Sequence, residues 1–432
     1  MIRTRFAPSP TGYLHIGGLR TAAYAYALAK HSSGEFLLRI EDTDQKREIK
    51  GATQKIFDVL EKFMNWDGVV IQSDRAKAGV YRDAALKLVN SGHAFYCQCQ
   101  PRNAKEQGFS TTLRDPCRDQ HNTTGAVKLR IPDNETLTYN DFVLKHEVSW
   151  NSNDVPDTIL LKSDRLFATY HLAVAVDDNF QKITHVLRGP EWISSVPVHL
   201  LVHRYLGYKW PEVGHPTSIL DPAGGKLSKR KGNSSVEQFL ADGYLPEALL
   251  NFVILLGWAP KDNRELFTLD EFVKAFDING FQKSNPALNL QKLDWFNAHY
   301  IRQKSDSELV QLITPYFNHP KLDEIIPLIK DRITKLSDVP SLTSFFTSNP
   351  PIPPDPSLSP DHLRFAINNY DRLIKGELID NIKSKGWKVG DFFMSLRIAI
   401  CGSRSTPPIT ETMLILGKDE SINRIKTAFH EY

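Results

Sequence analysis

Short strand-like runs alternate with helix-like runs in the first ninety residues, and this alternation restricts the fold of the chain more than any other feature. Residues 2–6 alternate in the manner of a short strand, and a helical run follows from about Gly18. A second strand is expected over 36–40. Between 56 and 64, apolar residues recur at the spacing of an amphipathic helix. Strands that alternate with helices favour a parallel α/β sheet.

The alternation stops near residue 95 and resumes near Tyr170, which predicts an insertion within one α/β domain. The interrupting stretch contains three clustered cysteines and shows little helical periodicity. A strand over 183–187 and a helix over 196–205 then restore the earlier pattern. We therefore expect two halves of one Rossmann-like domain at 1–92 and 169–235, separated by an inserted α+β subdomain at 93–168.

The rest of the chain is predicted to be all-α. Ser305 and Glu308 form a capping-box pattern before an apolar helical run. Residues 350–360 contain six prolines, which is typical of a linker between domains. We expect helical domains at 236–304 and 305–432, with the linker at about 349–360. Two to four domains are consistent with a length of 432 residues.

Composition excludes several classes of protein. The longest apolar run, 249–258, has ten residues and includes Asn251, whereas a membrane span needs about 18. The first ten residues contain no apolar signal core. Four cysteines in 432 residues are too few for a disulfide scaffold, so we expect a cytoplasmic protein with no membrane partner. A net charge of +3 permits an anionic partner without requiring one.

The first candidate site is a strand–turn–helix over residues 5–18 that ends in His15-Ile16-Gly17-Gly18. Two glycines allow a bulky anion to approach the backbone closely. The helix that follows would direct free N–H groups and the positive end of its dipole toward that anion. His15 can donate to a phosphate oxygen. A simple turn with a surface histidine is the alternative.

The second candidate site is the segment Lys226-Leu227-Ser228-Lys229-Arg230-Lys231-Gly232, preceded by Gly224-Gly225. Four cations within six residues on a loop flanked by glycines suit a triphosphate. A solvated charged face is the alternative, because isolated charge runs are commonly exposed.

Together these segments resemble the two signatures of class I aminoacyl-tRNA synthetases, and their first residues, His15 and Lys226, are 211 positions apart. Further motifs resemble those of bacterial-type glutamyl-tRNA synthetases. They are Arg5-Phe6-Ala7-Pro8-Ser9-Pro10-Thr11-Gly12, Arg39-Ile40-Glu41-Asp42-Thr43-Asp44, Tyr170-His171-Leu172-Ala173, Arg188-Gly189-Pro190-Glu191-Trp192, Pro407-Pro408 and Leu416-Gly417-Lys418. The chain departs from the family at Val174, where an Asn that helps to hold the amino acid is usual.

The resemblance implies two sets of binding residues. A set for glutamate would place Arg5 and Arg188 at the side-chain carboxylate, since guanidinium groups pair bidentately with carboxylates, and Glu41 at the ammonium. The other members of this set are Ala7, Ser9 and Tyr170. A set for ATP would consist of Pro8, Ser9, Thr11, Gly12, His15, Gly17, Gly18, Lys226, Ser228, Lys229 and Arg230. Of these, His15 and Lys229 are the expected catalytic residues.

The resemblance also implies the reaction and the partners. The enzyme would join L-glutamate to ATP, accompanied by Mg²⁺, as glutamyl-adenylate, and would then charge tRNA(Glu). Positioning and electrostatics suffice for attack at phosphorus, so no protein nucleophile is required. Residues 93–168 would bind the acceptor end of the tRNA, 236–304 the stem and 305–432 the anticodon. We expect a monomer.

Three other functions are compatible with parts of this pattern. A paralogue that glutamylates a modified base in tRNA would end soon after the second signature, whereas this chain continues for about 200 residues. A glutaminyl-tRNA synthetase would carry C-terminal β-barrels where helices are predicted. A non-catalytic tRNA-binding protein would not need His15, Lys229, Arg5 and Arg188 together.

Three cysteines in the insertion form a candidate metal site. Cys97, Cys99 and Cys117 could supply three thiolates, and a structural zinc site has four ligands. The resemblance points to Asp119 as the fourth ligand, and His121 is the alternative. Three free thiols in a reduced cytosol would explain the same residues, and the sequence alone leaves both interpretations open.

Overall fold

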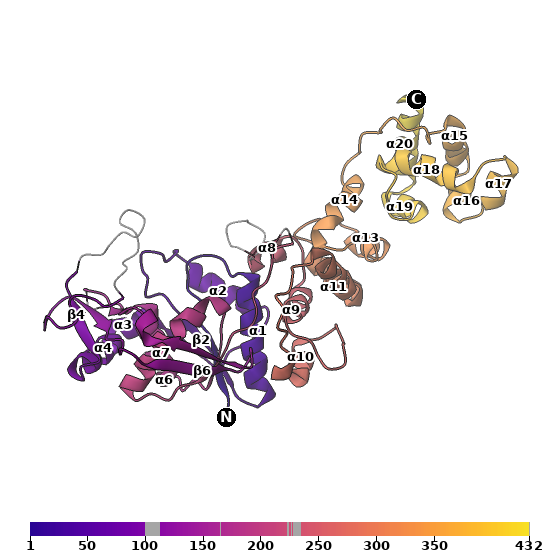
Figure 1. Ribbon diagram of the computed structural model, residues 1–432. Helices are drawn as coiled ribbons and strands as arrows, with labels where there is room; N and C mark the ends of the chain where they lie inside the picture. The colour runs from indigo at the N-terminus through magenta and orange to yellow at the C-terminus, as the bar shows by residue number, and fades with distance from the viewer. Residues whose placement is uncertain (100–112, 165, 223, 226, 228–234, 432) are drawn as a thin grey trace. The chain divides into compact units, whose positions relative to one another are not determined.

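The computed structural model describes residues 1–99, 113–164, 166–222, 224–225, 227 and 235–431. The chain divides into two compact units (Figure 1). The first unit comprises Met1–Phe239 and Leu249–Asn289, and the second comprises Leu240–Ala248 and Leu290–Tyr432. Each unit is described separately below.

The first unit contains a parallel sheet in the order β1-β2-β3, formed by β1 (Arg3–Phe6), β2 (Glu35–Ile40) and β3 (Gly68–Ile71). The predicted α/β pattern is confirmed here, because α1 (Ile16–His31) connects β1 to β2 and packs against both strands. Alanines fill the buried face of α1, which lets the helix lie close to the sheet. Residues 7–15 therefore connect the end of β1 to the start of α1.

A second sheet has the order β7-β6-β10-β9. Its strands are β6 (Thr136–Asp141), β7 (His146–Asn151), β9 (His185–Leu187) and β10 (Glu212–Gly214). The two sheets meet where the amide of Thr184 donates to the carbonyl of Arg3 at 2.9 Å. The β6–β7 hairpin falls within 93–168, yet it joins this sheet because Tyr139 packs against Val186 and Val213.

A third, antiparallel sheet consists of β4 (Ala94–Cys97), β5 (Ala126–Leu129) and β8 (Ile159–Leu161). One apolar core runs from this sheet into the helices that pack beside it. In the described part of the first unit, the helical segments other than α1 are α2 (Ala52–Leu60), α3 (Gln72–Lys77), α4 (Val80–Asn90), η1 (Ser152–Asp154), α6 (Tyr170–Phe180), η2 (Pro190–Ser195), α7 (Val196–Leu206), α10 (Leu269–Ala275) and η4 (Ile278–Gly280). Helices α8 (Val236–Ala241) and α9 (Pro246–Ile254) cross the boundary between the units in sequence.

The second unit is helical throughout its described part, as predicted. Its elements are α11 (Leu290–Gln303), α12 (Asp306–Ile313), α13 (Leu322–Ile329), η5 (Leu336–Asp338), α14 (Val339–Thr343), η6 (Ser344–Phe346), α15 (Pro360–Asn368), α16 (Tyr370–Ile374), α17 (Ile379–Ser384), α18 (Val389–Cys401), α19 (Ile409–Leu416) and α20 (Lys418–Glu431). Ser305 and Glu308 form the predicted capping box at the start of α12. Ser359 caps α15 after the proline-rich segment.

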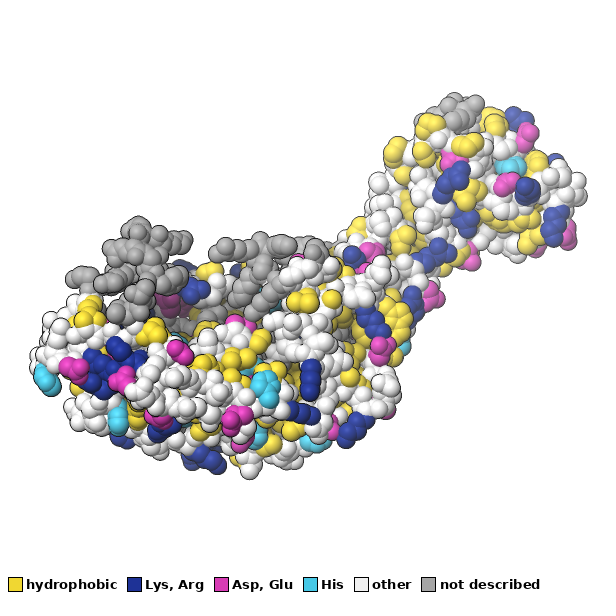
Figure 2. Space-filling model, in the orientation of Figure 1, with side chains coloured by type: hydrophobic (Ala, Val, Ile, Leu, Met, Phe, Trp, Pro, Cys, Tyr) yellow, Lys and Arg dark blue, Asp and Glu magenta, His cyan; other side chains and the backbone are white. Residues whose placement is uncertain are grey.

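The surface is mixed in charge. On the face shown in Figure 2, Lys and Arg side chains are interspersed with Asp and Glu, in keeping with a net charge of +3. Within the described ranges, every helix is too short or too polar to cross a lipid bilayer.

Buried Asp177 fastens α6 to the neighbouring helices of the first unit. Its carboxylate accepts hydrogen bonds from Gln72 Nε2 at 2.8 Å, Arg75 Nε at 2.5 Å and Tyr81 Oη at 2.8 Å. The residue is 0% exposed, so its carboxylate depends on these donors instead of on water. Removal of such a carboxylate leaves buried polar groups unpaired.

We predict that Asp177→Ala destabilises the first unit by about 3 kcal/mol or more, because three donors lose their acceptor. Hydrogen–deuterium exchange should show faster opening of α3, α4 and α6, and the thermal transition should shift downward. The matched control is Asp74→Ala, which removes an exposed partner of Lys77 and should cost less than about 1 kcal/mol. Equal effects of the two substitutions would contradict this role for Asp177.

Candidate active site

A pocket in the first unit opens beside the carboxyl ends of three strands. Ala7 follows β1, Glu41 follows β2 and Arg188 follows β9, and all three line the pocket. Ligands of open α/β sheets commonly bind at this edge, where loops from neighbouring strands converge. The pocket brings together every described residue that the sequence analysis assigned to ATP or glutamate: Arg5, Ala7, Pro8, Ser9, Thr11, Gly12, His15, Gly17, Gly18, Glu41, Tyr170 and Arg188.

Arg5 is held in place by a buried carboxylate on α6. Its Nε donates to Asp178 Oδ1 at 3.0 Å, and Arg39 donates to the same oxygen at 2.6 Å. Burial opposes ionisation of Asp178, but the charges of Arg39 and Arg5 outweigh it and lower the pKa of this carboxyl to about 2. Asp178 is therefore a carboxylate that fixes Arg5 at the pocket wall.

Glu41 is one of two described acidic residues that line the pocket, the other being Glu191. Its side chain is 9% exposed and its Oε1 lies 3.3 Å from Arg39 Nη2. Burial raises the pKa of Glu41, and the nearby charges of Arg39 and Arg5 oppose that shift. A bound ammonium group would favour the ionised form for the same electrostatic reason.

Arg188 is surrounded by neutral hydrogen-bond acceptors. Its Nε lies 3.1 Å from His215 Nε2, and its Nη1 lies 3.0 Å from His199 Nδ1 and 3.2 Å from Tyr170 Oη. Its Nη2 is buried without a hydrogen-bond partner among the described residues. In contrast to Arg5, Arg188 has no carboxylate within ion-pair distance in the described part of the chain.

His15 forms the N-cap of α1. Its Nδ1 accepts a hydrogen bond from the amide of Gly17 at 3.0 Å, so the proton of the neutral ring lies on Nε2. A Cβ at Gly18 would lie 3.0 Å from the Leu14 side chain, and one at Gly17 would lie 3.2 Å from the His15 ring. A side chain at either position would therefore require Leu14 or the His15 ring to shift by a few tenths of an ångström.

The second signature lies largely outside the described residues, including Lys226, Ser228, Lys229 and Arg230. Leu227, within this segment, and Ser235, beyond it, are described. Leu227 lines the pocket and its amide donates to Ile219, while Ser235 forms a bridge with His15.

Several pocket residues were not assigned a ligand from the sequence. Trp192 lines the pocket, is 38% exposed and lies against the Tyr170 ring, with the ring centroids 4.3 Å apart. Asp178, which contacts Arg5, and His199 and His215, which contact Arg188, lie behind the residues that line the pocket. The adjacent acids at 177 and 178, at the end of an apolar helix, were the one local signal that could have revealed Asp178.

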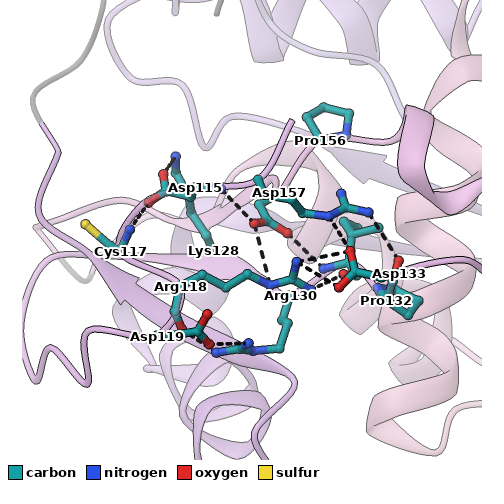
Figure 3. A network of polar contacts seen from close by, with 12 residues as sticks. Asp115, Cys117, Arg118, Asp119, Lys128, Arg130, Pro132, Asp133, Pro156 and Asp157 are labelled. Atoms are coloured by element: carbon teal, nitrogen blue, oxygen red, sulfur yellow. Dashed lines mark hydrogen bonds and ion pairs between the residues drawn. The ribbon is translucent and has the colours of Figure 1, made fainter. Parts of the chain in front are cut away.

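The candidate metal site contains a different fourth residue from the one predicted. Donor atoms of Cys97, Cys99, Asp115 and Cys117 lie within 4.8 Å of one another. Figure 3 shows Asp115 directed toward Cys117 and Lys128, whereas Asp119 lies beside Arg130. Asp119 is 82% exposed at its side chain and pairs with Arg130 at 2.8 Å, and His121 is not among the clustered residues.

This arrangement replaces Asp119 and His121 with Asp115 as the fourth candidate ligand. Asp115 Oδ1 accepts a hydrogen bond from the backbone amide of Cys117 at 2.8 Å. This contact directs the Asp115 carboxylate toward the thiols. Three thiolates and one carboxylate make four donors, which fits a tetrahedral ion. The residues present could therefore hold one divalent metal ion.

Comparison with known proteins identifies relatives over the whole chain. Residues 1–295 match the family model "tRNA synthetases class I (E and Q), catalytic domain", and residues 308–429 match "Anticodon binding domain". The glutamate–tRNA ligase of Borreliella burgdorferi is 36% identical, with 99% of this chain and 98% of the relative covered. That of Finegoldia magna is 34% identical, with 99% of each covered. The crystal structure of glutamate–tRNA synthetase from Elizabethkingia anophelis superposes with a TM-score of 0.88, at 29% identity and 99% coverage of both chains.

We predict at most one metal ion per chain at the cysteine cluster. Asp115→Asn should lower the metal content measured by elemental analysis, because it removes a charged donor, and Cys99→Ser should release the ion. The matched control is Asp119→Asn, which removes the same charge four residues away and should leave the metal content unchanged. A wild-type protein that is metal-free when purified without chelator would rule out the site.

Proposed function

Because this chain belongs to the family of bacterial glutamate–tRNA ligases, which are class I tRNA synthetases, we propose that it joins L-glutamate to ATP and transfers the glutamate to tRNA(Glu). The observation that carries this proposal is the distribution of charge in the pocket. Arg188 has no carboxylate partner among the described residues, and Arg5 lies in the same pocket. A buried arginine of this kind favours an anionic ligand, and a side-chain carboxylate fits its geometry.

The remaining charges of the pocket suit the other two ionised groups of glutamate. Glu41 would take the α-ammonium, and Ser9 and Tyr170 would supply neutral hydrogen bonds. The α-carboxylate would then be left free to react. A structure of the glutamate–tRNA ligase from Elizabethkingia meningosepticum, 30% identical to this chain, was determined in complex with its amino acid.

In the first step, an oxygen of the α-carboxylate would attack the α-phosphorus of ATP, and pyrophosphate would leave. His15 Nε2–H would donate toward the α-phosphate, where negative charge increases during attack. Lys229, supported by Lys226, Ser228 and Arg230, would neutralise the β- and γ-phosphates. Mg²⁺ would arrive with ATP as part of the substrate. The pocket would thus act by orientation and electrostatics.

In the second step, a hydroxyl of the terminal ribose of tRNA would attack the glutamyl carbonyl, and AMP would leave. We assign the acceptor end to 93–168, the stem to 236–304 and the anticodon to 305–432. The match of residues 308–429 to an anticodon-binding domain supports this assignment. It also favours tRNA charging over the shorter paralogue that modifies a base. We propose a monomeric, cytoplasmic enzyme.

We propose that zinc is the metal of the cysteine cluster, because thiolates are preferred zinc ligands. Its ligands would be Cys97, Cys99, Cys117 and Asp115. The ion would stabilise the three-stranded sheet of β4, β5 and β8, since Cys97 ends β4. No step of adenylate formation would depend on it.

The decisive experiment is ATP–pyrophosphate exchange with glutamate, with and without tRNA(Glu), followed by aminoacylation. Glutamate-dependent exchange and charging of tRNA(Glu) would support the proposal. Exchange with glutamine at equal efficiency, or charging absent under all conditions, would contradict it. Glutamylation of a modified base without a charged 3′ end would identify the paralogue instead.

We predict that Lys229→Ala slows adenylate formation about a hundredfold, because one charge is lost from a phosphate site that excludes water. Binding of tRNA, measured separately, should be unchanged. Lys231→Ala removes the same charge two residues away and should cost less than about fivefold. Unchanged activation together with weakened tRNA binding would make the segment an RNA contact.

We predict that Arg188→Gln lowers kcat/KM for glutamate at least about a hundredfold and reduces the preference for glutamate over glutamine. The two amino acids are nearly isosteric, so charge must separate them. Arg204→Gln is the control, since Arg204 pairs with Glu135 at the surface and should be neutral. An unchanged preference in a folded Arg188→Gln protein would contradict the assignment of the side-chain pocket.

A further inference from the structure

Arg188 receives support from three elements that are distant in sequence. Tyr170 begins α6, His199 lies in α7 and His215 directly follows β10. Three of the donor directions of the guanidinium are thereby occupied, at 3.0–3.2 Å. His199 is 2% exposed and His215 is 0% exposed, so water does not compete for these contacts.

The hydrogen bonds of Arg188 determine the tautomers of both histidines. Arginine can only donate, so His215 Nε2 must accept and its proton must lie on Nδ1. This proton points at Asp141 Oδ2, 2.6 Å away. Asp141 is fixed in turn by Tyr139 Oη at 2.9 Å and by the amides of Val143 and Leu144, both at 2.9 Å.

The same reasoning applies on the other side of the guanidinium. His199 Nδ1 must accept from Arg188, so His199 carries its proton on Nε2. That nitrogen lies 3.1 Å from His171 Nδ1, which therefore accepts. Burial and the charge of Arg188 lower the pKa of His199 well below its usual value and that of His171 to about 4, so both rings are neutral near pH 7.

The two arginines of the pocket are consequently held in opposite ways. Arg5 is fixed by a direct ion pair with a carboxylate, which it shares with Arg39. Arg188 is fixed by neutral rings, which orient it without a direct ion pair to any described carboxylate. Val174, where the family usually has an Asn, lines a small cavity behind the pocket together with Arg188 and His199. The Val174 side chain adds no hydrogen-bonding group to the contacts that hold Arg188.

We propose that His199 and His215 are positioning residues that set the preference for an acidic side chain, because they fix Arg188 without neutralising it. This inference rests on the proposed function of the pocket. A carboxylate in place of either ring would hold Arg188 equally well but would supply the charge that the substrate must bring. A neutral side chain with an acceptor at the same position would preserve both orientation and charge.

The test compares His199→Asn with His199→Asp, two nearly isosteric side chains that both offer an acceptor to Arg188 and differ in charge. ATP–pyrophosphate exchange, with tRNA present, would give kcat and KM for glutamate, glutamine and ATP. We expect His199→Asn to keep the KM for glutamate within about threefold of wild type. His199→Asp should raise it about a hundredfold and lower the preference over glutamine at least about tenfold. The KM for ATP should stay within about twofold in both.

His203→Asn serves as the control, because His203 lies one turn further along α7 and bonds the carbonyl of His199 instead of Arg188. Thermal unfolding would show that each variant is folded. If His199→Asp does not fold, a second pair of variants at His215 provides the test. His215→Gln keeps an acceptor for Arg188 Nε and should resemble wild type. His215→Leu removes that acceptor and should raise the KM for glutamate about tenfold.

The outcomes separate this inference from the proposed function. A wild-type protein without glutamate-dependent exchange would overturn the proposed function and, with it, the inference. An active wild type with the same glutamate KM in folded His199→Asn and His199→Asp proteins would overturn the inference alone. Equal losses in His215→Gln and His215→Leu would likewise show that hydrogen bonding to Arg188 is not what these histidines contribute.

Discussion

The buried ion pairs of Asp178 underlie the architecture of the pocket. One carboxylate oxygen accepts from Arg5 on β1 and from Arg39 on β2, and so ties α6 to two neighbouring strands. Because these groups are almost fully buried, loss of the carboxylate would leave Arg5 without its ion-pair partner and Arg39 with only Glu41 as an acidic partner, at a cost of about 3–5 kcal/mol. The position of Arg5 at the pocket wall, and the field that Glu41 experiences, both depend on this contact.

The neighbouring Asp177 also holds α6 in place by hydrogen bonds, but away from the pocket. Its donors come from α3 and α4, whereas those of Asp178 come from the sheet. Successive residues of a helix point about 100° apart, so two adjacent acids can bind two different layers. One end of α6 thus joins the helical layer to the strands, and Tyr170 at its other end reaches the pocket.

Much of the site could be predicted from the sequence, because its residues follow strands or open a helix. Arg5, Glu41 and His15 lie in such local patterns, and the carboxyl ends of adjacent parallel strands meet at one edge. The partners of these residues could not be predicted in the same way. Asp178 lies 173 residues from Arg5, and His215 lies 27 residues from Arg188, so no spacing rule connects them.

The sequence by itself determined the α/β and all-α classes, the residues available to the pocket and the charge types that it contains, because periodicity and motifs are local properties. Only the tertiary structure decided that Arg5 pairs directly with a carboxylate while Arg188, among the described residues, does not, and that Asp115 rather than Asp119 lies beside the thiols. Hydrogen bonds and ion pairs act over about 3 Å. Which of several acids lies within that distance of a given partner depends on how the chain is folded.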